Sequence, residues 1–456
     1  MKRLFTRKGF GIVVIFIDLI IIYLSIFFAY FLFEDMLEAY QENFYAFVSI
    51  SPYIGLCYLI LSQIFELDKP RDFTLWGVAY SVSLTIICLL FITMALSFFT
   101  REFAYPRSVL VLSSVMQIAF LSLWHLFVNK RHLKENINRS VLVIGYSQSK
   151  ELAYKLLRSR GMWSKVKYLS EPDSDNLNDL IDKSDVVFLS EDVDENRKQE
   201  IIEYCIGKWK TVFYEPKNPE ILLFNTSITQ IDDTPVLKVK LLFLGAGNEL
   251  LKRILDVVLC IIASVIFLIP ALIVAISLKI GGGSVFYRQE RVTREGKVFK
   301  IFKFRTMVEN AEALSGPVLA QETDKRITKL GHILRTTRLD EIPQIINILK
   351  GEMSIVGPRP ERPFFVEQFK KEIPEYDLRH RVKAGLTGLA QIQGKYNTTV
   401  RDKLKYDLLY INGYSLALDI KLIMQTLNIL LRKSSTEGVR DTVNYDEEIE
   451  KLTENK

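Results

Sequence analysis

Long apolar segments dominate the first third of the chain. Each of four such segments approaches or exceeds the roughly 20 residues that a helix needs to cross the hydrocarbon core of a bilayer. They cover residues 11–33, 44–65, 75–99 and 109–128. One such segment is also compatible with a buried helix of a soluble protein, but four in succession predict a bundle of transmembrane helices.

Basic residues indicate how these segments are oriented. Lys and Arg occupy four of the first eight positions, EDMLEAYQEN after the first segment has none, and NKRHLKENINR after the fourth is strongly basic. The positive-inside rule therefore places both ends of the bundle in the cytoplasm, although the two arginines of REFAYPR fit less well. The first segment is too long for a signal peptide and no A-x-A site follows it, so we expect it to be retained.

The next hundred residues alternate between short apolar runs and polar segments with helical spacing. Strands are predicted at 140–145, 165–170, 185–190 and 210–216. Such alternation is typical of a small parallel α/β domain of the Rossmann-like kind. Its first turn reads GYSQSKE, which keeps only Gly145 of a GxGxxG dinucleotide fingerprint. We therefore expect a structural or regulatory role for this domain rather than nucleotide binding.

A fifth apolar segment, residues 254–278, has Asp256 as its only charge and Pro270 in its second half. Its length is enough to span a bilayer, but proline also bends a helix, so the pattern alone leaves a spanning and a re-entrant helix open. GGGS then ends the helix. Residues 284–292 and 298–307 predict two strands, joined by TREGK in a hairpin.

The second of these strands mixes aromatic and basic residues. Alternation places Lys303 and Arg305 on one face and Phe302 and Phe304 on the other. The pattern fits an amphipathic edge strand on a membrane surface as well as a cationic face that binds phosphates.

The sequence RLDEIPQ at 338–344 places two carboxylates side by side. Asp340 could cap a helix by accepting from the free N–H groups of the first turn, where Pro343 is tolerated. IPQIINILK has helical spacing and ends at Gly351, a plausible C-cap. The alternative to a structural cap is an acidic catalytic pair, Asp340 with Glu341, among basic residues.

Three later motifs supply further candidates. In GPRP, prolines flank Arg359 and restrict its backbone, so its guanidinium loses little entropy on binding a phosphate. KAGLTGLAQIQG, which contains Gln391, fits a loop that approaches a ligand or a tight structural turn. Asp407 lies in the helical segment LKYDLLYING, where a surface ion pair is the simple interpretation.

Length, charge and cysteine content argue against a nucleic-acid-binding protein and against a disulfide-rich or zinc-binding one. The chain has 456 residues, enough for about three domains, and a formal charge of +6. That modest charge suits an anionic substrate or lipid surface better than nucleic acid. The four cysteines are scattered without a CxxC, and HExxH is absent, so neither a disulfide framework nor a zinc site is expected.

Together these motifs resemble the bacterial polyprenyl-phosphate glycosyl-1-phosphate transferases of the monotopic phosphoglycosyl transferase superfamily. The resemblance rests on LLKRILD, KIFKFRTM, LDEIPQIINILKGEMSIVGPRP, RVKAGLTGLAQIQG and KYDLLYING, in that order. It is to the long form, in which four membrane helices and a degenerate Rossmann-like domain precede the catalytic unit. One departure is Ile269, where the family often has Ser before the proline of its re-entrant helix.

The resemblance implies an enzyme that moves a sugar-1-phosphate from a UDP-sugar to undecaprenyl phosphate and releases UMP. This would start capsule, exopolysaccharide or other surface glycan synthesis at the cytoplasmic face of the bacterial inner membrane. Family frequency favours UDP-glucose or UDP-galactose. The protein could also form homo-oligomers and contact polysaccharide-assembly proteins. Two alternative functions remain open: a non-catalytic membrane scaffold and a nucleotide-sensing regulator of polysaccharide assembly.

The resemblance also implies roles for individual residues. Asp340 would be the nucleophile that forms a phosphosugar–aspartyl intermediate, and Glu341 a general base or metal ligand. Both carboxylates would bind Mg²⁺, which neutralises the diphosphate. The resemblance also implies phosphate contacts for Lys303 and Arg359 and an active-site role for Asp407, which would organise an arginine. The predicted substrate-binding residues further include Arg305, on the same strand face as Lys303, and Gln391 of the glycine-containing loop.

The expected fold class is a membrane protein with α and α/β parts. It comprises a four-helix transmembrane bundle at 1–134, a Rossmann-like domain at 135–247 and a membrane-associated α+β catalytic domain at 248–433. A polar tail would follow at 434–456. Because nucleotide sugars are cytoplasmic, residues 251–280 should form a re-entrant helix kinked at Pro270, with Lys252, Arg253 and Lys279 near the headgroups.

Overall fold

The computed structural model describes residues 7–34, 40–67, 75–102, 104–137, 139–158, 166–239, 242, 244–308, 326–394 and 398–430. The predicted tail at 434–456 lies outside these residues. Contacts within the chain define two units, the first ending at Glu215 and the second beginning at Pro216. Each unit has its own core.

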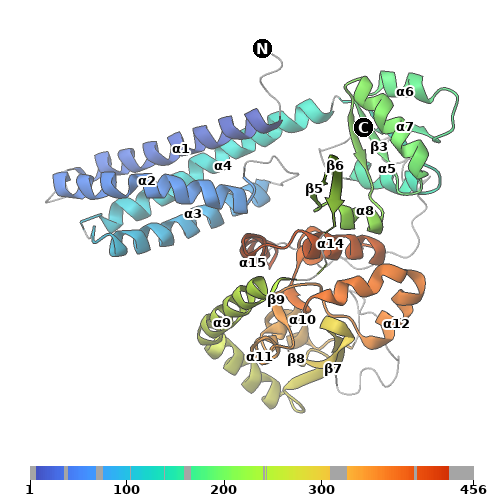
Figure 1. The fold of residues 1–456 in the computed structure, drawn as a ribbon. Coiled ribbons are helices and arrows are strands. Elements are labelled where there is room, and N and C mark those ends of the chain that lie inside the picture. Colours follow the sequence, from blue (N-terminus) through green and yellow to red (C-terminus); the bar gives the residue numbers. More distant parts are fainter. Residues whose placement is uncertain are drawn as a thin grey trace. The chain divides into compact units, whose positions relative to one another are not determined.

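Four long helices open the first unit (Figure 1). They are α1 (Arg7–Leu32), α2 (Tyr40–Ile64), α3 (Leu75–Phe99) and α4 (Arg107–Ile137). Each helix packs against two others, α1 and α3 both lying between α2 and α4. All four are long and apolar enough to cross a membrane, at the predicted positions. Helix α4 runs on to Ile137, however, so most of the basic segment after the predicted span continues the helix.

A buried polar cluster links three helices of this bundle. The carboxylate of Asp18 in α1 accepts a hydrogen bond from the Tyr58 hydroxyl of α2 at 2.8 Å and lies 3.2 Å from His125 Nε2 of α4. Asp18 is fully buried. Polar groups in an apolar bundle are costly unless they are hydrogen-bonded, and Asp18 Oδ2 is shared by Tyr58 and His125.

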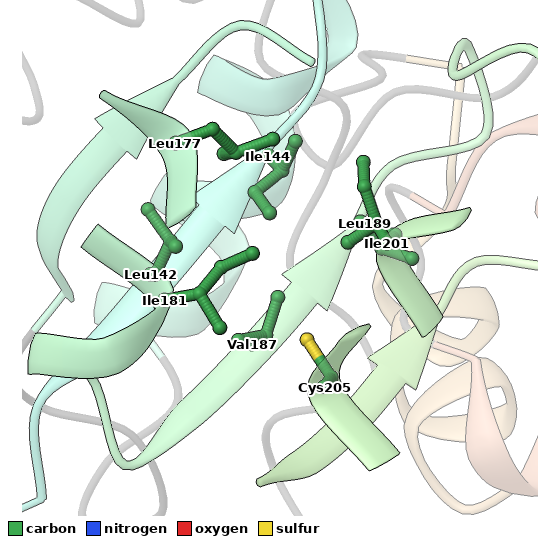
Figure 2. Packing of buried hydrophobic residues seen from close by; sticks show 8 residues of the cluster. All are labelled: Leu142, Ile144, Leu177, Ile181, Val187, Leu189, Ile201 and Cys205. Carbon is green, nitrogen blue, oxygen red and sulfur yellow. The ribbon is translucent and has the colours of Figure 1, made fainter. Parts of the chain in front are cut away.

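The rest of the first unit is the predicted parallel α/β domain. Its strands are β1 (Val141–Ile144), β2 (Val166–Ser170), β3 (Val186–Leu189) and β4 (Thr211–Tyr214). They form one parallel sheet in the order β2-β1-β3-β4. Because side chains alternate between faces, one face packs against α5 (Gln148–Arg158) and the other against α6 (Leu177–Lys183) and α7 (Glu195–Gly207). Figure 2 shows the core on the α6 and α7 side.

The second unit begins about thirty residues before the boundary predicted at 247. It opens with α8 (Asn218–Leu223) and the hairpin β5 (Ser227–Ile231) and β6 (Thr234–Lys238). Ile221 packs in a core with Leu404 and Leu408, and Asn412 Nδ2 donates to the Ile221 carbonyl at 2.8 Å. These long-range contacts attach the segment to the second unit, and its local pattern does not reveal them.

Helix α9 (Ala246–Ile280) is a single long helix that contains Pro270. Figure 1 shows it curving around one side of the second unit. Cys260 near its middle packs with β8, and Val274 and Leu278 near its end pack with another part of the same unit. Between these contacts, side chains such as Val265 and Ile269 are 73% and 69% exposed. α9 therefore contacts one folded body on both sides of an exposed apolar segment.

Lys252, at the start of α9, is not free to meet headgroups as predicted. Lys252 is buried and donates to Asp419 Oδ2 at 2.6 Å and to the Val356 carbonyl at 2.9 Å. Arg253 donates to the carbonyls of Ile348 and Leu349 at 2.6 and 2.7 Å. The expectation for Lys252 was therefore wrong, because distant segments supply its partners. For Arg253, whose side chain is only partly buried, it stays a prediction.

The remaining elements build an α+β body. Its strands are β7 (Phe286–Val292), β8 (Val298–Phe304), β9 (Ser354–Val356) and β10 (Gly385–Thr387). The hairpin β7–β8, with the turn η2 (Arg294–Gly296), is antiparallel as predicted, and β9 pairs in parallel with β10. The helices are α10 (Lys329–Thr336), η3 (Leu339–Glu341), α11 (Gln344–Lys350), α12 (Pro363–Glu372), η4 (Pro374–Arg381), α13 (Leu389–Gln393), α14 (Val400–Asn412) and α15 (Leu416–Leu430).

Candidate active site

Strand β8 carries Lys303 and is held between two layers of helix. Ile301 packs with Cys260 of α9 and Ile348 of α11, and Phe304 packs with the end of α9 and with α10. The interpretation of this segment as an amphipathic edge strand on a membrane surface is therefore wrong, because apolar side chains of both its faces pack in protein cores.

A buried asparagine fixes the register between this strand and α11. The side chain of Asn347 accepts from the Phe302 N–H at 2.9 Å and donates to the Lys300 carbonyl at 2.8 Å. It also donates to Glu352 Oε2 at 2.6 Å. Asn347 thus holds the strand next to the helix that follows the acidic pair. Sequence reasoning missed it, although an amide inside the apolar run IINIL is a usable signal.

The acidic pair lies in the short turn η3, which precedes α11. Arg338 adopts φ +55°, a left-handed conformation that is uncommon outside glycine and that reverses the chain between α10 and η3. Helix α11 has Pro343 at its N-cap, with no side-chain cap, and ends before Gly351 at φ +83° as predicted. The helix-cap interpretation of Asp340 was therefore wrong.

Three predicted residues meet at Glu341. Lys303 Nζ donates to Glu341 Oε1 at 2.8 Å, and Arg359 Nη2 donates to the same oxygen at 3.0 Å. Asp340 has only a looser contact, with its Oδ2 4.0 Å from Lys303 Nζ. Within the part of the chain that the structure describes, Glu341 is the centre of the ion-pair network, and Asp340 lies beside it.

The two neighbouring carboxyls differ in pKa. Burial opposes ionisation of Glu341, but Lys303 and Arg359 outweigh it and hold the pKa of Glu341 well below its usual value. Burial raises the pKa of Asp340, an effect that Lys303 opposes and Glu341 reinforces. A carboxylate with a depressed pKa is a weak base, so this geometry favours a positioning role for Glu341 over general-base catalysis.

Arg359 bridges the acidic pair and a second ion pair. Its side chain is 42% exposed, so it can contact a ligand while it contacts Glu341. Its carbonyl accepts from Arg379 Nη2 at 2.9 Å, and Arg379 Nη2 lies 2.8 Å from Asp407 Oδ2. Asp407 is buried, which excludes a surface ion pair, and it organises an arginine as expected. Sequence reasoning did not single out Arg379 itself.

Two other predicted residues lie in different surroundings. Arg305 donates to the Gly282 carbonyl just beyond the end of α9. Gln391 in α13 donates to the Leu386 carbonyl at 2.9 Å. Neither contact involves the acidic pair.

The glycines of the same motif serve packing. A Cβ at Gly385 would lie 2.1 Å from the Gly357 nitrogen, and one at Gly388 would lie 2.2 Å from the Gly357 oxygen. No larger residue fits where these backbones meet. The tight structural turn therefore accounts for the glycines of KAGLTGLAQIQG, and the ligand loop is not needed to explain them.

A magnesium ion would find few protein ligands here. Among the described residues no group of three or more His, Cys, Asp or Glu side chains gathers into a metal site. Glu341 Oε1 is already shared by two cations, which leaves Asp340 as the freer carboxylate. The residues suit Mg²⁺ only in the manner common for this ion, with one or two carboxylates and the remaining ligands from substrate phosphates and water.

The α/β domain has a carboxylate where a nucleotide phosphate would bind. Asp192, after β3, accepts from the backbone N–H groups of Tyr146 and Gln148 at 3.3 and 2.9 Å, at the start of α5. A Cβ at Gly145 would lie 1.7 Å from Ser190 Oγ. The N–H groups that would bind a pyrophosphate are thus occupied by the chain's own side chain.

Comparison with known proteins identifies the family to which the part of the chain with the acidic pair is similar. The bacterial sugar transferase family profile matches residues 247–433. A UDP-glucose:undecaprenyl-phosphate glucose-1-phosphate transferase of Caulobacter vibrioides is 34% identical over 245 residues, which are 50% of this chain and 88% of that protein. The chain therefore belongs to the bacterial sugar transferase family.

Two further relatives carry related names. A UDP-N-acetylgalactosamine-undecaprenyl-phosphate N-acetylgalactosaminephosphotransferase of Aeromonas hydrophila is 40% identical over 185 residues, 40% of this chain and 44% of that protein. A UDP-glucose:undecaprenyl-phosphate glucose-1-phosphate transferase of Escherichia coli K12 is 37% identical over 220 residues, 46% of this chain and 47% of that protein. The aligned part is about half the length of these two relatives, whose names specify different sugars.

Proposed function

We propose that this chain transfers a sugar-1-phosphate from a UDP-sugar to undecaprenyl phosphate and releases UMP. This reaction would be the first membrane step of capsule, exopolysaccharide or other surface glycan synthesis. The main support is that the two carboxylates of the acidic pair make different contacts. Glu341 neutralises Lys303 and Arg359, and Asp340 stays next to them without a close ion pair of its own.

In the first step an oxygen of the ionised Asp340 attacks the β-phosphorus of the UDP-sugar. A new carboxyl oxygen–phosphorus bond forms, and the bond from that phosphorus to the bridging oxygen breaks. The electron pair leaves with UMP, and a phosphosugar–aspartyl ester remains. Lys303 and the exposed part of Arg359 are placed to stabilise the negative charge on the phosphoryl oxygens.

In the second step an oxygen of undecaprenyl phosphate attacks the same phosphorus. The bond to Asp340 breaks, the carboxylate is regenerated and the lipid-linked sugar diphosphate is released. A phosphate monoester is largely ionised at neutral pH, so this attack needs little help from a base. Glu341 then serves to hold Lys303 and Arg359 in place, and a bound Mg²⁺ would add charge neutralisation for the phosphates.

The decisive experiment measures UMP release from a panel of UDP-sugars by the full-length chain, with and without undecaprenyl phosphate. We expect release with one or a few of these sugars, and none from the near-isosteric variant Asp340→Asn. Asp233→Asn, in the exposed turn between β5 and β6, is the matched control and should keep full activity. Acceptor-dependent UMP release by Asp340→Asn at a near-normal rate would rule out this nucleophile.

A second measurement addresses the intermediate. Intact-protein mass spectrometry with UDP-sugar and no lipid acceptor should show a sugar-phosphate adduct on the wild type and none on Asp340→Asn. Adding undecaprenyl phosphate should remove the adduct. Acceptor-dependent transfer with a mass that never changes would argue for direct transfer between the substrates.

We also propose that α1–α4 span the cytoplasmic membrane and that α9 enters and leaves it on the cytoplasmic face. The contacts of α9 on both sides of its exposed segment support this, because Cys260 and Leu278 pack in cores of the same unit. Lys252 near the start of α9 is buried in the same unit, and the helix curves around that unit (Figure 1), so a bend accompanies these contacts. Pro270 provides the bend by removing one helical hydrogen bond.

Cysteine labelling tests this topology. With the four native cysteines replaced, single cysteines at Gly247 and Ser284 lie beyond opposite contacts of α9 with its unit, at positions that are exposed. An impermeant thiol reagent should reach neither position in intact cells and both once the membrane is opened. Labelling of position 284 alone from outside would show a spanning helix.

A further inference from the structure

A hollow of about 440 Å³ lies at the far end of strand β8 from Lys303. Its lining includes four cationic side chains and two carboxylates: Arg294, Lys297, Lys350, Lys383, Glu295 and Glu352. Val298 also lines it, and Lys303 follows five residues later, about 16 Å along a strand. The hollow is therefore separate from the acidic pair, and it has the size of a small-molecule site.

The two carboxylates of the hollow already have partners. Glu295 contacts Lys297 at 2.8 Å and Arg294 at 3.2 Å. Glu352 Oε2 accepts from Asn347 Nδ2 at 2.6 Å, so its charge is directed toward the core. Neither carboxylate shows an ion pair with Lys383 in the described structure.

Lys383 is a cation without a close ion-pair partner in the described structure, and the charges of Asp256 and Glu249 act on it only from a longer distance. It is half-buried, and among the described residues no hydrogen bond or ion pair satisfies its ammonium group. A Cβ at Gly351 would lie 3.6 Å from Lys383 Nζ and 3.8 Å from Arg253 Nη2, so two cations flank the same point. Burial lowers the pKa of Lys383, and the charge of Arg253 lowers it further.

Support of a helix end does not explain this arrangement. A cation near the C-terminus of α11 would be favoured by the helix dipole. Arg253, however, already donates to the last carbonyls there, those of Ile348 and Leu349. Lys383 adds a second positive charge without a carbonyl partner, which costs free energy unless an anion is bound.

We propose that this hollow, the η2–Gly351 hollow, binds a phosphate group between Lys383 and Arg253. Phosphate accepts charge-assisted hydrogen bonds from both an ammonium and a guanidinium group. The floor is rigid, because Thr293 Oγ1 donates to the Glu352 carbonyl at 2.9 Å and accepts from the Ala384 N–H at 3.1 Å.

The headgroup of an anionic phospholipid is one source of that phosphate. Leu250, Leu251 and Ile254, which surround Arg253 in sequence, are 62%, 50% and 51% exposed. Exposed apolar side chains next to a basic residue are typical of a helix at a membrane surface. A soluble phosphate ester offers the same chemistry, so the test has an arm for each source.

The test is a thermal-unfolding titration of the full-length chain in a neutral detergent. Phosphatidylglycerol, phosphatidylcholine and glycerol phosphate are added in separate series, and a ligand that binds the folded chain raises Tm saturably. We expect a saturable rise with phosphatidylglycerol and little with phosphatidylcholine. A rise with glycerol phosphate of the same apparent affinity would assign the site to soluble phosphate esters instead.

Variants locate the binding. Lys383→Gln should weaken the apparent affinity about tenfold, because one charge-assisted hydrogen bond is lost. Lys383→Arg should retain most of it. Lys371→Gln, which removes an exposed lysine of α12, is the matched control. Lys303→Gln should leave the titration unchanged, which separates this hollow from the candidate active site.

The same variants give a readout that a purely structural lysine would not. Without ligand, Lys383→Gln should unfold at the same temperature as the wild type or at a higher one, because an unpaired charge has been removed. Equal titration curves for Lys383→Gln and Lys371→Gln would overturn the proposal. So would a saturable rise that Lys303→Gln abolishes and Lys383→Gln retains.

Discussion

Arg379 and Asp407 form a buried ion pair, and Arg379 also donates to the backbone carbonyl of Arg359. Two guanidinium nitrogens of Arg379 lie 3.0 and 2.8 Å from Asp407 Oδ2, and a third donates to the Tyr376 hydroxyl at 2.6 Å. The hydrogen bond from Arg379 to the Arg359 carbonyl connects this pair to the candidate active site. Asp407 is thus a positioning residue, three contacts away from Glu341 of the acidic pair.

This connection makes the effect of Asp407→Asn depend on Arg359. The substitution leaves the Arg379 charge buried without compensation, so the free energy of unfolding should fall by about 3 kcal/mol. Misplacement of Arg359 should lower kcat/KM about 100-fold. In an Arg359→Ala background the same substitution should still lower Tm but should change kcat/KM little further. Equal losses of kcat/KM in both backgrounds would place Asp407 outside this connection.

The pH dependence of UMP release tests the environment of Asp340. Burial raises the pKa of this carboxyl and Lys303 opposes the shift, so Lys303→Gln should raise that pKa further. Since the nucleophile is the ionised form, the acidic limb of kcat/KM should begin at higher pH in the variant. The measurement is the initial rate of UMP release between pH 4 and 8, on the order of four pH units that bracket a raised carboxyl pKa. An unshifted acidic limb would mean that this limb does not report Asp340.

The ionised carboxylate of Glu341 should contribute to the free energy of unfolding at neutral pH and lose that contribution in acid. Its pKa in the folded chain lies below its ordinary value of 4.5, so its ionised form stabilises the fold above that pH. The contribution is lost as the pH falls through the depressed pKa. Glu341→Gln should therefore reduce the free energy of unfolding by about 1–3 kcal/mol at neutral pH. The gap in Tm between variant and wild type should narrow below pH 4.5, and a gap that widens there would contradict the ion-pair geometry.

Local patterns allowed much of this structure to be predicted. Apolar runs of the right length gave the four helices of the bundle, and alternation gave the parallel sheet and the β7–β8 hairpin. The gathering of Lys303 and Arg359 at Glu341 agrees with the motifs that named them. These features depend on residue types that are close together along the chain.

Pairings between distant segments were not predictable from the same patterns. Lys252 finds Asp419 more than 160 positions away, and Asn225 donates to the Asn412 carbonyl from a segment assigned to another domain. Arg379 and Arg381 are close together in the sequence, which did not show which of them would face Asp407. A single sequence specifies that a buried charge needs a partner, but it does not say which partner folding will supply.

The bundle offers a last test, at Asp18. Its carboxylate satisfies both Tyr58 and His125, and all three are buried. Asp18→Leu would leave the Tyr58 hydroxyl and the His125 ring without this partner in an apolar interior, at a cost of about 1–3 kcal/mol. Asp18→Asn keeps an acceptor for the hydroxyl and should cost less. Phe16→Leu, at a position 63% exposed on the same helix, is the control and should be nearly neutral.

Hydrogen exchange of the full-length chain in detergent can localise the effect. In Asp18→Leu, amides of α1, α2 and α4 should exchange faster, because the cluster links these three helices. Amides of β1 and β3, which belong to a separate core, should keep their protection. Faster exchange confined to α1 would mean that Asp18 stabilises its own helix and does not connect it to the other two.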